Sequence, residues 1–459
     1  MKIKIEKIGI NGEGIGYVEN KPTFIPSALP SETVEAIIDK KFDRYNVGHV
    51  EQILIKSPKR MNPPCPVQDR CGGCALMTCT LPYQAEIKEE LLKEALTKYA
   101  GKIDFRLIKP IVVNPVPYSY RNQCKLPVRM SRGQLISGMY QPSSNHFVAV
   151  DRCLVHEEEL DNKRTQILAV LQKHGWDEFN PKTYKGLRYI ILRGFDGIYQ
   201  VTLVTGKNRF TQECIDDLCE IPGLNSIYAS INLDKHTHEL FGNEVTHLAL
   251  AKTLECKMGE LVFRLSPQSF FQLNRTQALN IYSKVAELVK PSKLIVEAYC
   301  GVGAMTLMLS KKGEEVIGIE TISSAVKNAN ENARLNKIKN VQFIAGDAAV
   351  QLQNISKKQQ IDVLVVDPPR SGLDDTMIAM IMKSRIPHLI YVSCNPSTLA
   401  KNLKYLLTEY DVEEITPFEL FSHTPLVETV VSLRRLNKKQ RTAAYESEKS
   451  IYQTDSSEY

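Results

Sequence analysis

One cysteine and one glutamate lie in stretches whose residue types and spacing predict a reactive site. Cys394, in YVSCNPSTLA, stands where an apolar strand run ends and Asn395 begins a turn. Glu428, in HTPLVETVV, opens another apolar run. A cysteine at a strand end is typical of a nucleophile, and a carboxylate at a neighbouring strand end is typical of a base. His423 is the competing candidate for the base, and a packed core thiol is the alternative for Cys394.

This pair of groups suits chemistry at C5 of uracil, which is a weak carbon nucleophile. A thiolate that adds to C6 turns the ring into an enolate, so that C5 can take a methyl group. A base must then remove the C5 proton, so that elimination releases the cysteine. We therefore expect Cys394 to add to the ring and Glu428 to accept the proton.

A second motif allows a different reaction on a nucleobase. Asp367 precedes two prolines in VVDPPRSGL, which resembles the motif that grips an exocyclic amine in amino-group methyltransferases. Those enzymes carry an aromatic residue after the motif, whereas Arg370 stands here, and an amine requires no covalent nucleophile. Methylation of a nucleobase amine through Asp367 therefore remains the alternative activity.

The stretch VEAYCGVGAMTL predicts a ligand-binding turn between a strand and a helix. Gly301 and Gly303 would let the backbone approach a ligand, but Thr306 stands where a dinucleotide fingerprint needs a third glycine, which disfavours NAD. Any single acidic residue at a strand end could be a helix cap. A series at four strand ends instead predicts S-adenosylmethionine, which offers hydrogen-bond donors but no pyrophosphate; the four are Glu297, Glu320, Asp347 and Asp367.

The elements that must position these residues form an alternating pattern over residues 260–436. Apolar runs separated by helical stretches predict a doubly wound, Rossmann-like parallel sheet in an α/β fold. The runs are Lys293–Glu297, Glu315–Ile319, Val341–Ile344, Ile361–Val366, His388–Val392 and Val427–Leu433.

The remaining chain divides by pattern into three parts. Five short strand-like runs in residues 1–56 predict an OB-like β-barrel, a fold that often holds single-stranded or looped nucleic acid. Residues 57–259 show a mixed α+β pattern with one long helix, Tyr83–Tyr99. Residues 437–459 are polar, and we expect them to be disordered.

Composition sets broad limits on the class of protein. The chain has 459 residues with 58 Lys and Arg against 52 Asp and Glu, a formal charge of +6 that is compatible with an RNA partner. The sequence shows no secretory signal and no apolar run of membrane-spanning length, so we expect a cytoplasmic protein. In that compartment, eleven cysteines indicate thiols, metal binding or catalysis rather than disulfides.

Three of these cysteines, in CPVQDRCGGC, are spaced C-x5-C-x2-C and predict a metal site. A radical S-adenosylmethionine enzyme would require C-x3-C-x2-C. Cys79 would complete a compact site suited to zinc, whereas Cys153 would close a long-range site. The first three ligands would be Cys65, Cys71 and Cys74.

Several of these stretches together resemble the RNA 5-methyluridine methyltransferases. The similar segments are EAYCGVGAMTL, VVDPPRSGL, YVSCNPSTLA, HTPLVETVVSL and SFFQLN, and NGEGIGY with FIPSALPSETV resembles the TRAM domain of that family. The resemblance spans nearly the whole chain except the tail, and SCNPSTLA is its most specific element. A non-catalytic RNA-binding protein with a degenerate methyltransferase fold is the alternative from another class.

The resemblance implies roles for particular residues. Cys394 would be the nucleophile and Glu428 the proton acceptor, while Ala304 replaces an asparagine of a close relative and casts doubt on a side-chain contact there. The pocket for cofactor and uracil would be lined by Gln272, Tyr299, Glu320 and Asp367, with Asp347 beside the adenine. A 4Fe-4S cluster would be held by Cys65, Cys71, Cys74 and Cys153.

The resemblance also bears on the RNA. A barrel together with a metal cluster favours 23S ribosomal RNA over transfer RNA as the substrate, and we expect a monomer. The basic strand YRNQCKLPVR could hold phosphates through Arg121, Lys125 and Arg129, or be a solvated edge strand.

Overall fold

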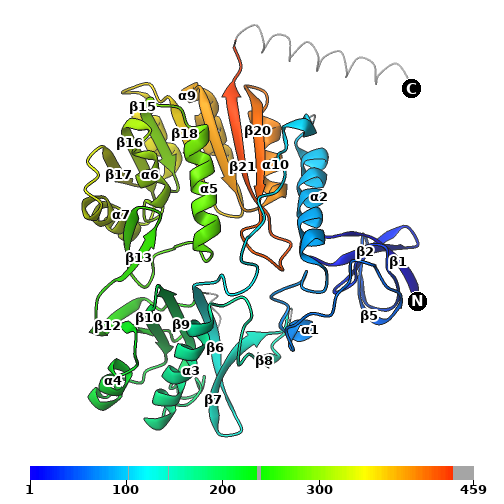
Figure 1. The fold of residues 1–459 in the computed structure, drawn as a ribbon, viewed down its shortest axis with the longest axis vertical. Coiled ribbons are helices and arrows are strands. Elements are labelled where there is room, and N and C mark those ends of the chain that lie inside the picture. The colour runs from blue at the N-terminus through cyan, green and yellow to red at the C-terminus, as the bar shows by residue number, and fades with distance from the viewer. Residues whose placement is uncertain (102, 143, 235–238, 438–459) are drawn as a thin grey trace.

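The structure is a computed structural model that describes all residues except 102, 143, 235–238 and 438–459. Figure 1 shows two large sheets, one above the other, with a small barrel beside them. From the sequence we expect residues 437–459 to be disordered. Of these, residues 438–459 lie outside the described part of the chain. Among the described residues, no helix combines the length and apolar character needed to cross a membrane.

The N-terminal strands close into a five-stranded barrel in the order β1-β2-β3-β5-β4. Alternation in the first strand turns Ile3 and Ile5 inward and the intervening charged residues outward, as a half-buried strand requires. The strands are β1 (Lys2–Ile8), β2 (Gly14–Val18), β3 (Lys21–Ile25), β4 (Thr33–Lys41) and β5 (Asn46–Ile55).

The central segment forms a seven-stranded sheet in the order β12-β11-β10-β9-β6-β7-β8. Helices α3 (Glu158–Lys173) and α4 (Gln212–Cys219) contribute Leu160, Ile167 and Leu218 to the core beside this sheet. The strands are β6 (Gln123–Ser131), β7 (Gln134–Tyr140), β8 (Phe147–Ala149), β9 (Leu187–Phe195), β10 (Ile198–Thr205), β11 (Leu224–Ile231) and β12 (Glu244–Leu250).

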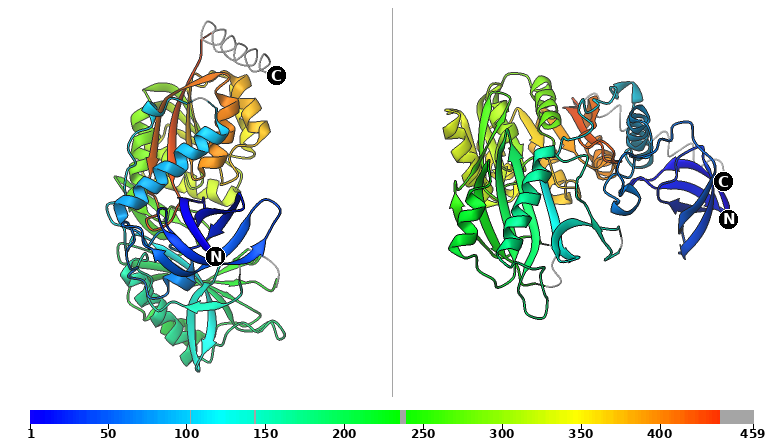
Figure 2. Two further views of the ribbon diagram at one scale, coloured as in Figure 1. Left: turned by 90° about the vertical axis from the view of Figure 1, so that its right-hand side faces the viewer. Right: turned by 60° about the horizontal axis from the view of Figure 1, so that its bottom comes forward.

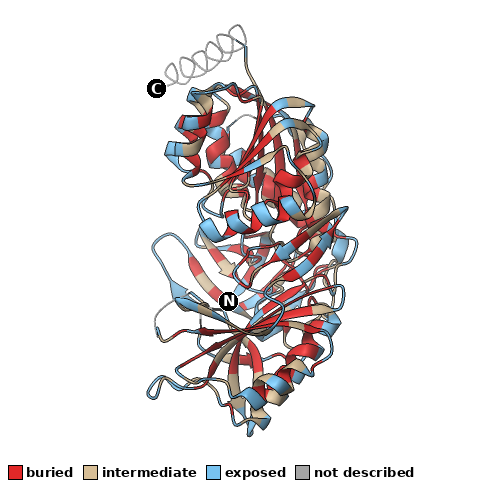
Figure 3. Ribbon diagram, turned by 90° about the vertical axis from the view of Figure 1, so that its left-hand side faces the viewer, coloured by how far each residue is buried: buried red, intermediate tan, exposed pale blue. Residues whose placement is uncertain are grey.

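The C-terminal sheet has the order β17-β16-β15-β18-β19-β21-β20. Two separate apolar cores pack on its two faces, so helices cover both sides and the inner strands are largely buried, whereas the edge strands β17 and β20 keep exposed residues (Figure 3). The strands are β15 (Ser292–Ala298), β16 (Gly313–Glu320), β17 (Val341–Ala345), β18 (Val363–Val366), β19 (His388–Ser393), β20 (Tyr410–Phe418) and β21 (Glu428–Arg435). Helix α5 (Arg275–Leu288) precedes the first of these strands, and the helices between them are α6 (Ala304–Leu309), α7 (Ser323–Leu335), α8 (Ala348–Ser356), α9 (Asp375–Ser384) and α10 (Pro396–Leu406).

This sheet differs from the expected parallel sheet at one edge. Five strands are parallel, but β21 pairs antiparallel with both β19 and β20. The loop of residues 419–427 reverses the chain between β20 and β21, and strands joined by so short a connection pair antiparallel. The expected pattern also lacked β20, because its exposed acidic residues interrupt the apolar run.

Two elements that begin before residue 260 pack against the C-terminal sheet. Helix α2 (Leu81–Tyr99) places Leu92 and Leu96 in the same core as Leu403 of α10, beside the barrel in Figure 2. The hairpin β13 (Leu254–Met258) and β14 (Leu261–Leu265) spans the boundary expected at residues 259–260, and its apolar side chains belong to the other core of that sheet. The shorter helices α1 (Gln68–Cys71) and η1 (Phe105–Leu107) lie within connections.

Candidate active site

Strand register brings Cys394 and Glu428 together. Ser393 of β19 pairs with Thr429 of β21 in an antiparallel ladder. Continued by one residue, the same register sets Cys394, just after β19, opposite Glu428, the first residue of β21. Asp367 follows β18, the parallel neighbour of β19, at the same edge of the sheet. The structure thus unites three residues that are separated by up to about sixty positions in the sequence.

The turn that carries Cys394 is held on both sides. Asn395 caps helix α10, because its Oδ1 accepts a hydrogen bond of 3.0 Å from the Ser397 N–H. Its side-chain Nδ2 donates to the Arg370 carbonyl at 3.2 Å, and the Thr398 hydroxyl donates to the same oxygen at 3.2 Å. These bonds tie the cysteine turn to the Asp-Pro-Pro loop, so the Asn-Pro pair both ends the strand and orients Cys394.

The surroundings of Cys394 favour the protonated thiol. Burial, together with the negative charges of Glu428 and Asp367, raises its pKa to about 11, although the Arg370 guanidinium opposes this rise. Cys394 is half-buried and Arg370 is exposed. The thiol therefore needs a partner that takes its proton, or neutralisation of the two carboxylates, before it can attack.

The two carboxyl groups beside Cys394 also hold protons more tightly than usual. Burial raises the pKa of Asp367. Burial raises the pKa of Glu428 as well, the charge of Asp367 adds to this rise, and Arg370 offsets part of it. A carboxylate whose pKa is raised toward neutrality is a stronger proton acceptor than an ordinary glutamate. The site thus contains a nucleophile candidate and a base candidate side by side.

One buried residue at this site carried no motif in the sequence. The hydroxyl of Tyr282, in α5, shares a hydrogen bond with Gln272, and its pKa is raised by burial and by the charges of Asp367, Glu297 and Glu428. The tyrosine therefore connects Gln272 to the acidic cluster. Nothing in the sequence distinguishes Tyr282 from any other apolar-face residue of an amphipathic helix.

Glu297 lies at the end of β15 and is fully buried. Burial raises its pKa to about 8, although a hydrogen bond from the Thr306 hydroxyl counteracts the rise. The residue expected to disfavour a dinucleotide, Thr306, is thus the partner of a strand-end carboxyl. Its position three residues after Gly303 was visible in the sequence, but its contact was not.

The glycine turn has the shape of a ligand cradle. Gly301 (φ +54°) has open space where a side chain would be, whereas a side chain at Gly303 (φ +81°) would meet the Phe343 ring at 2.6 Å. Gly301 donates its N–H to Glu320 Oε2 at 3.0 Å. Tyr299 has φ +68°, a strained conformation for a bulky residue and one that clusters at ligand sites.

Two positions near the glycine turn have local roles. Asp347 is exposed and caps α8, because its Oδ1 accepts from the Val350 N–H at 3.0 Å. The interpretation of a strand-end acid as a helix cap therefore applies to Asp347. Ala304 is buried in the core, so it offers no polar group to a ligand.

His423, the competing base, lies apart from the acidic cluster. It is buried with its ring 4.6 Å from that of Tyr118, and its Nδ1 lies 3.2 Å from the Gln84 side chain. Burial lowers its pKa to about 4, and the charges that act on it are those of Glu419 and Lys88. A neutral, packed imidazole of this kind is a structural residue of the loop that leads to Glu428.

The cysteine-rich segment meets a distant cysteine in space. One small cavity is lined by all four residues of the long-range set: Cys65, Cys71, Cys74 and Cys153. Cys79 lies elsewhere, buried in an apolar cluster with its thiol 3.2 Å from the Leu76 carbonyl. The geometry therefore unites the set that contains Cys153 and separates Cys79 from it.

The donor chemistry at this cavity suits a soft metal group. Burial raises the pKa of Cys74 to about 12. Burial acts on Cys153 in the same sense, but a hydrogen bond and the charge of His156 outweigh it and lower the pKa of that thiol. Within the described ranges, no three or more His, Cys, Asp or Glu side chains stand in metal-binding geometry. Four thiols around one cavity nevertheless fit the ligand set of an iron–sulfur group.

The three cationic side chains of the stretch YRNQCKLPVR have different surroundings. The Arg121 side chain is half-buried, with its guanidinium over the rings of Phe421 and Tyr120, at 5.4 and 5.9 Å, and beside the cysteine cavity. Arg129 is also half-buried and donates to the Tyr140 hydroxyl at 3.1 Å, whereas Lys125 is exposed. Of the three side chains, Lys125 is the one most open to a phosphate.

The fold and the site together indicate a class of enzyme. A sheet with helices on both faces, a glycine turn, acidic strand ends and a cysteine–carboxylate pair is typical of a transferase that uses a bound cofactor. A family model described as tRNA (Uracil-5-)-methyltransferase matches residues 86–436, and a TRAM domain model matches residues 1–50. The chain therefore belongs to the uracil-5-methyltransferase family and is an RNA methyltransferase with an N-terminal TRAM domain.

Individual relatives agree with this assignment. An uncharacterized RNA methyltransferase of Bacillus cereus is 34% identical over 442 residues, covering 94% of this chain and 96% of the relative. One of Halalkalibacterium halodurans is 34% identical over 444 residues, covering 94% and 95%. The crystal structure of Pyrococcus abyssi tRNA (uracil-54, C5)-methyltransferase in complex with S-adenosyl-L-homocysteine superimposes with a TM-score of 0.74 at 24% identity, covering 94% of this chain and all of that one. The two chains therefore share one fold over nearly their whole length.

Proposed function

We propose that this enzyme methylates C5 of a uridine in RNA through a covalent bond between Cys394 and C6 of the base. The observation that carries the proposal is the strand register that sets Cys394 opposite Glu428. Both residues stand beside Asp367 in a family defined by uracil-C5 transfer. An amine substrate would use neither the cysteine nor the base.

The chain's own residues divide the reaction between them. Once its proton has been lost to solvent, the Cys394 thiolate forms a bond to C6, and the electrons of the C5–C6 double bond move toward the O4 oxygen. When bound, S-adenosylmethionine supplies the methyl group that C5 takes. Glu428 then accepts the C5 proton, the C5–C6 double bond forms again, and the thiolate leaves. Arg370, whose charge lowers the pKa of Cys394, favours the thiolate at both ends of the cycle.

The cofactor would be held around the glycine turn. Open space over Gly301 and the acidic strand ends fit a ligand with ribose hydroxyls and an ammonium group. The residues that we propose for it are Gln272, Tyr299, Gly301, Gly303, Glu320, Asp347 and Asp367. Except for Gln272, which precedes α5, they lie at or just after the carboxyl ends of strands of the C-terminal sheet, where a doubly wound, Rossmann-like sheet would bind its ligand.

For the cysteine cavity we propose a 4Fe-4S cluster. The support is that Cys65, Cys71, Cys74 and Cys153 line one space, whereas the zinc alternative with Cys79 loses its fourth ligand. Such a cluster would pin residues 65–74 to the middle of the central domain. Two residues further on, the Leu76 N–H donates to the His423 carbonyl at 2.9 Å, which joins this part of the chain to the loop of residues 419–427 that leads to Glu428.

For the substrate we propose 23S ribosomal RNA, with transfer RNA as the alternative. The support is the combination of a TRAM barrel with four clustered cysteines. We further propose a cytoplasmic monomer in which residues 1–56 and 57–259 hold the RNA while residues 260–436 perform the transfer. The target uridine must leave its stack to reach Cys394, so an unpaired or looped base is expected.

RNA that carries 5-fluorouridine tests the covalent step. The fluorine at C5 cannot leave as a proton does, so the adduct on Cys394 should persist through denaturing electrophoresis in the presence of S-adenosylmethionine. The matched variant Cys394→Ser should give no stable adduct. Absence of the adduct with the wild-type enzyme, under conditions where it methylates normal RNA, would overturn the proposal.

A further inference from the structure

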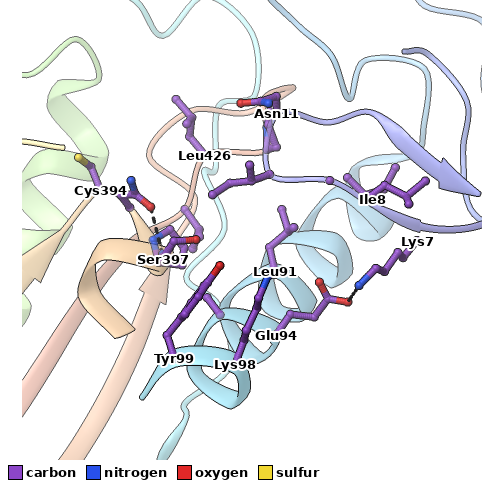
Figure 4. Close-up of a pocket in the computed structure, with 18 of the residues that line it drawn as sticks. Lys7, Ile8, Asn11, Leu91, Glu94, Lys98, Tyr99, Cys394, Ser397 and Leu426 are labelled. Atoms are coloured by element: carbon purple, nitrogen blue, oxygen red, sulfur yellow. Dashed lines mark hydrogen bonds and ion pairs between the residues drawn. The ribbon is translucent and has the colours of Figure 1, made fainter. Parts of the chain in front are cut away.

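A cavity of ≈520 Å³ lies at the junction of the barrel, helix α2 and the Cys394 turn. Figure 4 shows its walls: Lys7, Ile8 and Asn11 come from the barrel, and Leu91 and Tyr99 come from α2. Residues Arg370 and Cys394–Ser397 close it on the side of the C-terminal sheet. Its size falls in the range of small-ligand sites, about 300–1,000 Å³.

The occupant of this cavity is neither the target base nor the methyl donor. In Figure 4 the sulfur of Cys394, a residue that lines the cavity, points away from α2, so the reacting atom faces away from the walls that α2 and the barrel provide. The strand-end acids expected to hold the cofactor, such as Glu320 and Asp347, do not line the cavity. The space therefore adjoins the reaction centre without containing its chemistry.

The charge of the walls favours an anion. Three cations line the cavity, namely Lys7, Lys98 and Arg370, against one carboxylate, Glu94. That carboxylate already accepts a hydrogen bond from Lys7 Nζ at 2.9 Å, which leaves Lys98 and Arg370 as the surplus positive charge. A phosphate group within such a cavity would be attracted by both.

The walls also present faces for stacking. The half-buried ring of Tyr99 has Lys98 Nζ at 5.0 Å and Lys401 Nζ at 5.1 Å from its centroid. Across the cavity stands Phe24 of the barrel. An aromatic ring flanked by cations is the arrangement with which proteins hold single-stranded nucleic acid.

Phe24 continues this surface onto the outside of the barrel. Its ring lies edge-on to Tyr45 at 5.6 Å, and Tyr45 stacks on Phe42 at 4.6 Å with an angle of 22° between the planes. Phe42 is 43% exposed and Tyr45 is 38% exposed. The same hairpin, KKFDRYN, carries three exposed cations, Lys40, Lys41 and Arg44. We call Phe24, Tyr45 and Phe42 the aromatic path.

We propose that the cavity binds the unpaired nucleotide next to the target uridine, and that the aromatic path stacks the bases that follow on the same strand. The RNA would thus leave the catalytic sheet over α2 and continue along the barrel as a single strand. This inference rests on the proposed function, because Cys394 marks the position of the target base. A duplex would present no free base faces to these rings.

Binding measurements on the full-length enzyme without cofactor test this inference apart from catalysis. The probes are a short single-stranded RNA containing one uridine and the same RNA annealed to its complement. We expect Phe42→Ala with Tyr45→Ala to weaken binding of the single strand by roughly five- to hundred-fold, from the usual value of a base–aromatic stack. Binding of the duplex should stay unchanged.

Phe105→Ala is the matched control, because Phe105 is 42% exposed but lies on η1, outside the barrel and the cavity. We expect it to leave both affinities unchanged. A second measurement uses 5-iodouridine at single positions of the probe, with irradiation and mass spectrometry. We expect crosslinks to Tyr45 and Tyr99.

Three outcomes would overturn the inference: wild-type affinity of the double variant for the single strand, equal loss for the duplex, or crosslinks confined to the central sheet. Failure of the proposed function gives a different result, because RNA binding and crosslinks would then persist while no 5-methyluridine forms. Methyl transfer by the wild-type enzyme with unchanged affinity of the double variant would reject only the inference.

Discussion

Replacing Glu428 with glutamine separates the two chemical roles at the site. The substitution keeps the shape of the buried side chain but removes both its charge and its ability to accept a proton. A general base contributes about 10²–10⁴ in rate, so turnover should fall by about that factor. Because the block falls after the bond to C6 has formed, a protein–RNA adduct should accumulate on normal uridine.

The same variant should slow turnover but make the Cys394 thiol easier to ionise. With a pKa of about 11, about one Cys394 thiol in a hundred is ionised at pH 9. The charge of Glu428 is one cause of that high pKa, so Glu428→Gln should lower the pKa, and each unit gives about tenfold more thiolate. Alkylation of Cys394 by iodoacetamide, followed by peptide mass spectrometry, measures this fraction.

Cys394→Ala provides the control for both assays, because it forms no adduct and reports the labelling of all other thiols. Normal turnover of Glu428→Gln would refute the assignment of the base. A stalled variant without an adduct would place the block before the C6 bond and refute the order of steps. Slower alkylation than in the wild-type enzyme would refute the electrostatic reasoning.

Three further predictions concern stability and metal content. Lys88 Nζ lies 2.6 Å from Glu419 in a buried pair, so Lys88→Met should lower the free energy of unfolding by about 3–5 kcal/mol in urea, and an unchanged midpoint would contradict this. Glu297 has its pKa raised from 4.5 to about 8, so the folded state binds the extra proton and stability should decrease as pH rises across that window. Glu297→Gln should reduce this decrease, to which Asp367 and Glu428 contribute in the same sense, when unfolding is compared near pH 6 and near pH 9; an unaltered pH dependence would exclude Glu297 as one of its sources. Cys71→Ser should lose iron from anaerobically purified enzyme while Cys79→Ser keeps it, and equal iron in both variants would contradict the proposed ligand set.

Local patterns predicted most of the C-terminal sheet. Each of the six apolar runs corresponds to an observed strand, with ends that agree within two residues, because buried parallel strands are continuously apolar. The α/β methyltransferase fold and the barrel are likewise confirmed. β20 was missed because it is an edge strand whose exposed side carries Asp411 and Glu413, which hides the apolar pattern.

Features that depend on distant contacts had no sequence signal. Helix α2 precedes the central sheet in the chain but packs on α10, and nothing in its amphipathic pattern names that partner. Tyr282 acquires its place beside Gln272 and Asp367 only through the rotation of α5 above the sheet. Conversely, Cys394 could be singled out because a cysteine, a cap and a proline are adjacent in the chain.

The identity of the methylated nucleoside tests the central claim most directly. The enzyme would be incubated with methyl-labelled S-adenosylmethionine and unmodified 23S ribosomal RNA or, separately, unmodified transfer RNA, and the RNA would then be digested to nucleosides. The account predicts label in 5-methyluridine from the ribosomal RNA; the same nucleoside from transfer RNA alone would keep the chemistry and replace the substrate. Label in a methylated amine would contradict the roles of Cys394 and Glu428.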